Sequence, residues 1–142
     1  MHIFLTGPLQ SGKSTAIARY LAGRPEAPGG FRTHWDRAGG HLALELLETG
    51  ETLSVATMEP HGVRADRAAF DAAGERLLSA PAGRRSLLLM DELGFLERCS
   101  PVFQRAVFTL LDGPTPVLGV LRRHEKSPFW GPVSRRADVR LL

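Results

Sequence analysis

Apolar residues along the chain gather into short runs that are separated by polar and turn-forming residues. Three of these runs, at residues 2–6, 87–90 and 116–121, show no regular polar alternation. This pattern is typical of central strands whose two faces are both covered. A shorter run at residues 138–142 predicts one more strand.

A different spacing, with apolar residues three and four positions apart, predicts helices between these strands. It covers residues 13–22 and 70–80, and the second of these segments stops before Pro81. Ser100 and Pro101 are typical of a helix start, and an apolar stripe follows them. Because strands and helices alternate, we predict an α/β fold with a mainly parallel sheet flanked by helices.

Residues 31–57 interrupt this alternation with short runs that are joined by turn-forming residues. Within them Leu42, Leu44 and Leu46 alternate with more polar positions, which suits a strand with one covered face. We therefore expect an antiparallel β-meander inserted around residues 31–57. A length of 142 residues with 43% hydrophobic content is enough for one core. We expect a single domain over residues 1–142.

The net charge of the chain does not identify a binding partner. The chain has 18 lysines and arginines against 15 aspartates and glutamates, a net charge of +3. This balance suits an anionic ligand, while nucleic acid stays a possible partner that the charge does not support by itself. One cysteine, Cys99, allows no disulfide within the chain, and no apolar run is long enough to span a membrane. Without a charged leader at the first residues, we expect a cytoplasmic protein and no membrane partner.

The strongest chemical signal is the stretch GPLQSGKS, from Gly7 to Ser14, directly after the first apolar run. It matches the phosphate-binding loop, or P-loop, in which a glycine and a Gly-Lys-Ser end enclose four residues. Glycines let successive backbone N–H groups turn toward phosphate oxygens, and the helix that follows adds the positive charge of its N-terminus. Lys13 would reach the β- and γ-phosphates, and the Ser14 hydroxyl would bind Mg²⁺.

We therefore predict a site for a nucleoside triphosphate such as ATP or GTP, with Mg²⁺ as the cofactor. The predicted nucleotide-binding residues are Gly7, Pro8, Gln10, Ser11, Gly12, Lys13, Ser14 and Thr15. Lys13 is also expected to act in catalysis, because its charge would contact the reacting phosphates.

Two carboxylates, Asp91 and Glu92, follow the apolar run at residues 87–90. The carboxyl end of a parallel strand is where such a sheet binds its ligand. Asp91 would hold Mg²⁺ directly or through water. Glu92 would polarise the water that attacks the γ-phosphate.

Arg122 and Arg123 follow the run at residues 116–121. They would lie at the same edge as Asp91 if the two strands are parallel neighbours. An arginine there would stabilise charge that develops on the γ-phosphate, and we predict this role for Arg122. The alternative is that Arg122 and Arg123 belong to a solvated basic loop. We expect Arg135 and Arg136 to be surface residues.

Four stretches that together cover nearly the whole chain resemble successive blocks of one family. They are GPLQSGKST, GGFRTHWDRAGGHLALELLETGETLSVA, LLLMDELGFLERCSPVFQRAV and PVLGVLRRHEKSPF. The family is that of the small nucleoside-triphosphatases first noted in thermophiles. Its most specific parts here are DELGFLE and the early Gly-Phe-x-Thr block, whereas the P-loop is common to many families.

The resemblance implies a P-loop α/β fold with an extra strand between the P-loop strand and the acidic strand. It also implies Mg²⁺-dependent hydrolysis of nucleoside triphosphates with loose base selectivity. By position, it makes Asp91 and Glu92 the partners of metal and water, and it gives phosphate or metal binding to Gly7, Gly12, Lys13, Ser14 and Thr15.

Three further positions are less clear from the resemblance. Glu97 matches an acid of the family block, although a solvated or helix-capping carboxylate would look the same. The family usually has an acid two places after the Thr of the Gly-Phe-x-Thr block and an arginine before a second Gly-Phe, but this chain has Trp35 and His41–Leu42 instead.

A phosphate site does not by itself define what happens to the phosphate. A water-polarising Glu92 favours hydrolysis over transfer. A nucleoside or polynucleotide kinase and a non-catalytic nucleotide-binding regulatory module are the alternatives, and the oligomeric state is not predicted.

Overall fold

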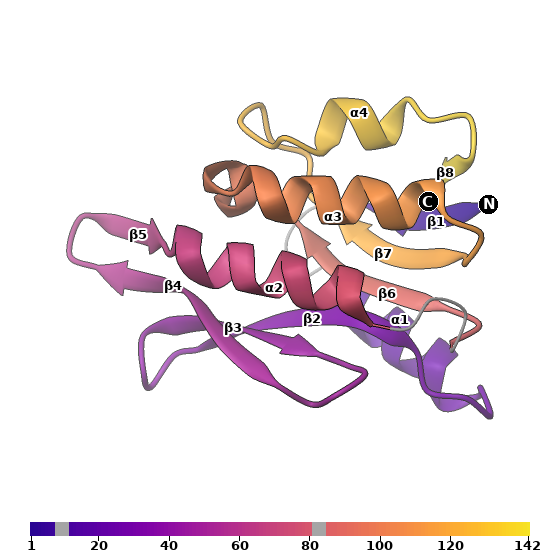
Figure 1. The fold of residues 1–142 in the computed structure, drawn as a ribbon, viewed down its shortest axis with the longest axis horizontal. Helices are drawn as coiled ribbons and strands as arrows, with labels where there is room; N and C mark the ends of the chain where they lie inside the picture. Colours follow the sequence, from indigo (N-terminus) through magenta and orange to yellow (C-terminus); the bar gives the residue numbers. More distant parts are fainter. Residues whose placement is uncertain (8–11, 81–84) are drawn as a thin grey trace.

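One eight-stranded sheet forms the centre of the molecule in the computed structural model, which describes residues 1–7, 12–80 and 85–142. The strands are β1 (His2–Leu5), β2 (Gly29–Asp36), β3 (His41–Leu46), β4 (Thr52–Glu59), β5 (Gly62–Ala65), β6 (Leu88–Leu93), β7 (Val117–Leu121) and β8 (Val139–Leu141). The helices are α1 (Lys13–Ala22), α2 (Arg67–Ser79), η1 (Leu96–Cys99, a 3₁₀ turn), α3 (Pro101–Asp112) and α4 (Trp130–Ser134). Figure 1 shows this arrangement.

The strand order is β5-β4-β3-β2-β6-β7-β1-β8, and it divides the sheet into two parts. From β2 to β8 all neighbouring strands are parallel, whereas β2, β3, β4 and β5 pair antiparallel. Strand β7 lies between β1 and β6, as the family resemblance implied. The predicted α/β class with a mainly parallel sheet and an antiparallel meander is confirmed.

Helices cover both faces of the parallel part of the sheet. Helices α2 and α3 lie side by side on one face, and α1 lies on the other (Figure 1). The larger core fills the space beneath α2 and α3, where Phe31, Phe70 and Phe103 are fully buried and their rings touch. The smaller core gathers around Ile17 of α1. This two-sided cover explains why the strands 87–90 and 116–121 lack polar alternation.

Side-chain caps start the two helices of the larger core where the sequence predicts them. Asp66 accepts a hydrogen bond from the backbone N–H of Ala69 at the start of α2. Ser100 accepts one from Phe103 at the start of α3, and Pro101 occupies the first helical position. Each cap satisfies a backbone donor that the first helical turn leaves without a partner.

Gly30 permits the close approach of β2 to β6. Its φ of 90° lies in the left-handed region, and a Cβ atom there would run into the backbone carbonyl of Leu89. Any larger residue would therefore push β2 away from the strand that carries Asp91. This contact joins the meander to the parallel sheet.

Several boundaries differ from the sequence prediction. The meander is longer than residues 31–57, because β5 adds a fourth antiparallel strand and β2 pairs with β6 from Gly29 onward. Strand β5 has only four residues and little apolar patterning, so the sequence does not reveal it. Helix α4 was also not predicted, since its five residues include Gly131 and Pro132.

Arg135 is exposed as expected, whereas Arg136 is only partly exposed because ion pairs and a hydrogen bond hold its side chain against the protein. The guanidinium of Arg136 donates to Asp112, to Asp138 and to the carbonyl of Leu111, and its side chain is only 21% exposed. A cation is favoured at that place because it meets the carboxyl end of α3. None of the helices in the described ranges is long and apolar enough to cross a membrane.

Candidate active site

A cavity of about 510 Å³ opens at the carboxyl ends of the parallel strands β1, β6 and β7. Its lining residues are Thr6, Gly7, Lys13, Glu92, Val120, Arg122, Arg123 and Trp130. The structure thus brings Lys13, Glu92 and Arg122 into one cavity. Lys13 begins α1, Glu92 belongs to β6 and Arg122 directly follows β7. The crevice lies where parallel sheets generally bind ligands.

The N-terminus of α1 forms one side of this cavity. Gly12 precedes the helix with a φ of 86°, a left-handed conformation that glycine adopts without strain. The Lys13 ammonium donates a hydrogen bond to the carbonyl of Gly7 at 2.9 Å. Ser14 and Thr15 stand exposed in the first turn, and the remaining predicted nucleotide-binding residues, Pro8, Gln10 and Ser11, lie outside the described residues.

Asp91 lies inside β6, with Leu93 as the last residue of the strand, so the carboxylates do not close the strand as the sequence suggested. Burial raises the pKa of the Asp91 carboxyl, and the neighbouring Glu92 carboxylate raises it further. Arg32 and Lys13 act in the opposite direction. A carboxylate whose charge is disfavoured by burial gains from a bound cation, and Asp91 and Ser14 offer the hard oxygen donors that Mg²⁺ prefers. The residues present therefore fit Mg²⁺.

Thr33 of β2 holds the backbone of this acidic pair. Its hydroxyl donates to the carbonyl of Asp91 at 3.1 Å and lies 3.4 Å from the backbone N–H of Glu92, which donates to it. The sequence by itself does not assign this role to Thr33. The available signal was its place in the Gly-Phe-x-Thr block, but only the pairing of β2 with β6 brings the two segments together.

Arg122 follows β7, the parallel neighbour of β6, as the prediction required. Its backbone N–H donates to the carbonyl of Leu93 at 2.9 Å, which holds the two strand ends together. Its guanidinium carbon lies 5.4 Å from the centre of the Phe95 ring, a cation–π contact. Phe95 in turn stacks on His124 at 4.3 Å. These contacts restrict Arg122 to the neighbourhood of the cavity that it lines.

Glu97 is buried and not solvated, with 6% of its surface exposed. Its carboxylate accepts a hydrogen bond of 2.5 Å from the backbone N–H of Gly94, so it holds the turn that follows β6. Burial raises its pKa to about 7, and the Glu92 carboxylate adds to this rise while the Gly94 N–H and Arg122 oppose it. The Glu97 carboxyl group therefore interacts electrostatically with Glu92 and Arg122, which both line the cavity.

Trp130 also lines the cavity, although no motif in the sequence marks it as a site residue. The guanidinium carbon of Arg123 lies 5.5 Å from the centre of its ring. The Ser127 hydroxyl accepts hydrogen bonds from the N–H groups of Phe129 and Trp130 and donates to the carbonyl of Gly94. This hydroxyl links the start of α4 to the turn after β6 and so fixes Trp130 beside the cavity.

Together, the strand order, the Gly-Lys-Ser turn into α1 and the acidic strand separated from β1 by β7 define a P-loop protein. A sequence model of the family described as NTPase matches residues 2–142. The chain therefore belongs to this NTPase family, as the resemblance suggested, and the predicted nucleoside-triphosphatase class is confirmed.

Curated relatives agree with this assignment. The nucleoside-triphosphatase THEP1 of Methanosarcina acetivorans is 30% identical over 140 residues, covering 91% of this chain and 80% of the relative. The nucleoside-triphosphatase THEP1 of Thermococcus kodakarensis is 31% identical over 138 residues, covering 87% and 77%.

Solved structures agree in fold. A human cancer-related nucleoside triphosphatase superposes with a TM-score of 0.75 at 25% identity, covering 99% of this chain and 87% of that chain. THEP1 from Aquifex aeolicus superposes with a TM-score of 0.71 at 17% identity and the same coverage, a likeness in fold alone.

Proposed function

We propose that this chain hydrolyses ATP, GTP and other nucleoside triphosphates to the diphosphate and phosphate, with Mg²⁺ as its cofactor. The observation that carries the proposal is the convergence of Lys13, Glu92 and Arg122 on one cavity beside Asp91. The names of the relatives support the reaction class. The cavity supports the assignment of roles to residues.

Binding of the triphosphate is the role of the P-loop and the first turn of α1. Backbone N–H groups at the start of α1 contact the phosphates, and the N-terminus of this helix contributes partial positive charge. Lys13 exchanges its contact with the Gly7 carbonyl for the β- and γ-phosphate oxygens. Glycine is favoured at Gly12 by its φ of 86° and not by lack of space, since nothing lies within 4 Å of where its Cβ would stand.

The Ser14 hydroxyl and the Asp91 carboxylate would hold Mg²⁺. When bound, the ion neutralises charge on the β- and γ-phosphate oxygens. Thr33 keeps the Asp91 backbone in place through its hydroxyl, and Arg32 on the neighbouring strand adds positive charge. Thr33 thus fixes the strand that carries Asp91, and Arg32 favours the ionised carboxylate.

Glu92 orients the attacking water and accepts its proton as the new oxygen–phosphorus bond forms at the γ-phosphate. The bond from the γ-phosphorus to the bridging oxygen breaks, and the diphosphate leaves. Arg122, held over Phe95 at the rim, stabilises the charge that develops on the γ-phosphate oxygens. Lys13 does the same from the P-loop side.

The test is phosphate release from ATP and from GTP, with Mg²⁺ and with a chelator, for the parent and for Lys13→Ala. The substitution should lower turnover by about a hundredfold or more and weaken binding of a fluorescent nucleotide, because one cation is removed from the phosphates. Lys126→Ala, which changes the other lysine of the chain at an exposed position outside the cavity lining, is the control.

Equal turnover and affinity in the parent and Lys13→Ala would contradict the proposal. A further arm adds a nucleoside or a nucleic acid 5′ end. Phosphate that appears on this acceptor faster than in solution would favour the kinase alternative. Tight binding without release or transfer would favour the regulatory module.

A further inference from the structure

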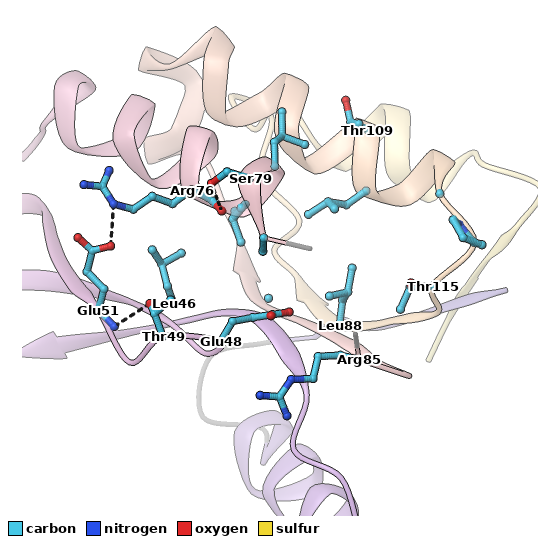
Figure 2. Close-up of a pocket in the computed structure, with 17 residues that line it drawn as sticks. Leu46, Glu48, Thr49, Glu51, Arg76, Ser79, Arg85, Leu88, Thr109 and Thr115 are labelled. Atoms are coloured by element: carbon cyan, nitrogen blue, oxygen red, sulfur yellow. Dashed lines mark hydrogen bonds and ion pairs between the residues drawn. The ribbon is translucent and has the colours of Figure 1, made fainter. Parts of the chain in front are cut away.

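A second cavity, of about 590 Å³, opens at the opposite edge of the sheet. It lies where β2 and β6 begin, between the sheet and the last turns of α2 and α3 (Figure 2). Leu88 of β6 lines it, whereas Glu92 at the other end of the same strand lines the active-site cavity. The two cavities share no lining residue, and the volume is in the range of pockets that bind small ligands.

The walls of this amino-edge cavity are largely apolar. Gly30, Leu46 and Leu88 form the side of the sheet, and Leu77 and Leu110 face them from α2 and α3. An apolar ligand body would be removed from water on several sides here. Burial of that kind contributes about 25 cal/mol per Å² of apolar surface.

The two arginines at the rim already have partners. The Arg76 guanidinium lies 2.6 Å from the Glu51 carboxylate, and Figure 2 shows this ion pair at one end of the cavity. Arg85 donates to the backbone carbonyl of Ala27 at 3.1 Å, and its guanidinium points away from the cavity in the same view. The cavity therefore has no cation directed into it from these two side chains.

Glu48 differs from Glu51 because no ion pair with a described residue holds its carboxylate. Its carboxylate lies over the backbone of Gly29 beside the Leu88 side chain, and Figure 2 shows it extending across the sheet side of the cavity. No hydrogen bond or ion pair joins this carboxylate to any other residue in the ranges 1–7, 12–80 and 85–142. An anion on the wall of an apolar cavity is stabilised by a cation that comes to it.

The carboxyl end of α2 adds to the same preference. Leu78, Ser79 and Ala80 line the cavity at the end of this helix, where the partial charge of the backbone is negative. Arg76 in the last turn is drawn toward Glu51 instead. Glu48 and this helix end therefore favour a positive charge and disfavour a phosphate or carboxylate in the cavity.

We propose that the amino-edge cavity binds a small organic cation, in which an ammonium or guanidinium group contacts Glu48 and an apolar body packs against the leucines. The cation donates hydrogen bonds to the Glu48 carboxylate. The apolar body lies between Leu77 and Leu110 on the helix side and Leu46 and Leu88 on the sheet side. This site is separate from the nucleotide site and does not depend on the reaction proposed for it.

The experiment titrates phenylpropylammonium into the full chain and follows the methyl resonances of the leucines that line the cavity by NMR. Phenylpropanol, which has nearly the same shape without the charge, is the matched ligand. Glu48→Gln is the matched variant. Glu75→Gln, which removes a carboxylate at an exposed position of α2 outside the lining, is the control.

We expect saturable shifts at Leu46, Leu77 and Leu110 with the ammonium ion. Affinity should fall about tenfold or more in Glu48→Gln and for phenylpropanol, because a charge-assisted hydrogen bond is lost. Glu75→Gln should bind like the parent.

The absence of saturable binding, equal binding of the alcohol, or shifts confined to the first turn of α1 would each overturn the proposal. Equal binding by Glu48→Gln would overturn it too. Should Glu48→Gln not fold, the comparison of ammonium and alcohol in the parent still decides the question.

Discussion

The two ends of β6 differ in chemistry although they belong to one strand. At the carboxyl end the cavity contains Lys13, Arg122 and Arg123 together with Glu92. At the amino end leucines from the sheet and from two helices line the cavity, Arg76 pairs with Glu51, and Glu48 makes no ion pair with any residue that the structure describes. One end suits a polyphosphate, and the other suits an organic cation.

The direction of the chain through an α/β sheet explains much of this contrast. Helix α1 follows β1 and therefore begins at the carboxyl edge, where its N-terminus carries positive charge. Helix α2 precedes β6 and therefore ends at the amino edge, where its carboxyl end carries negative charge. The backbone thus gives the two edges opposite preferences before any side chain is considered.

The largest effect expected from a single substitution at the carboxyl end is that of Glu92→Gln. Turnover should fall about a hundredfold to ten-thousandfold, because glutamine cannot accept the proton of the attacking water. Nucleotide affinity should stay close to that of the parent, since the role is confined to the chemical step. Phosphate release and fluorescent-nucleotide binding measure the two quantities. Phenylpropylammonium binding at the amino end should not change, and unchanged turnover in a folded variant would remove Glu92 from the mechanism.

Glu97→Gln tests the buried carboxyl behind Glu92. In the folded chain its pKa is about 7 against an ordinary value of 4.5, so the folded state binds the proton more tightly than the unfolded state. The free energy of unfolding of the parent, relative to the variant, should therefore fall by up to about 3 kcal/mol as pH rises between these values. Below pH 4.5 the difference in the free energy of unfolding between parent and variant does not change with pH. Above a pH of about 7 the parent keeps the full loss of about 3 kcal/mol.

Urea denaturation across that pH range measures the difference. Glutamine keeps an oxygen that accepts the N–H of Gly94, so the local turn is preserved. Glu75→Gln, at an exposed site, is the control that should show no such dependence. A parent-to-variant difference that stays flat with pH would show that Glu97 is not the titrating group.

Arg122→Ala and Arg123→Ala separate a directed contact from a general effect of charge. Both residues line the carboxyl-end cavity, but Arg122 packs on Phe95 and Arg123 on Trp130. Arg122→Ala should lower kcat about tenfold or more with little change in KM, because its charge acts on the transition state. Steady-state kinetics with ATP measure kcat and KM for both variants. Equal losses in both variants would indicate only a general electrostatic effect on an anionic substrate.

The smallest effect concerns Thr33, which holds the acidic pair from the neighbouring strand. Thr33→Val removes the hydroxyl that contacts the backbone of Asp91 and Glu92. A hydrogen bond of this kind contributes about 1 kcal/mol, so we expect turnover to fall about fivefold. Thr33→Ser keeps the hydroxyl and should stay near the parent rate in the same phosphate-release assay. A loss of equal size in Thr33→Ser would point to strand packing instead.

The elements that the sequence predicted well have strong local causes. The start of α3 was visible because Ser100 and Pro101 are a cap and a first helical residue, and both act as expected. The central strands were visible because two-sided burial demands unbroken apolar runs. Strand β5 and helix α4 were not visible, because their stability comes from neighbours and not from their own four or five residues.

The candidate site divides in the same way. The sequence alone determined the P-loop pattern and the acidic pair at Asp91 and Glu92, since contiguous residues carry that chemistry. Tertiary structure alone decided that Arg122 faces the same cavity, that Thr33 holds the acidic pair, and that Glu97 is buried. Strand order brings these residues together across long separations in the chain, and burial depends on what packs against a side chain. Neither strand order nor burial is a local property of the sequence.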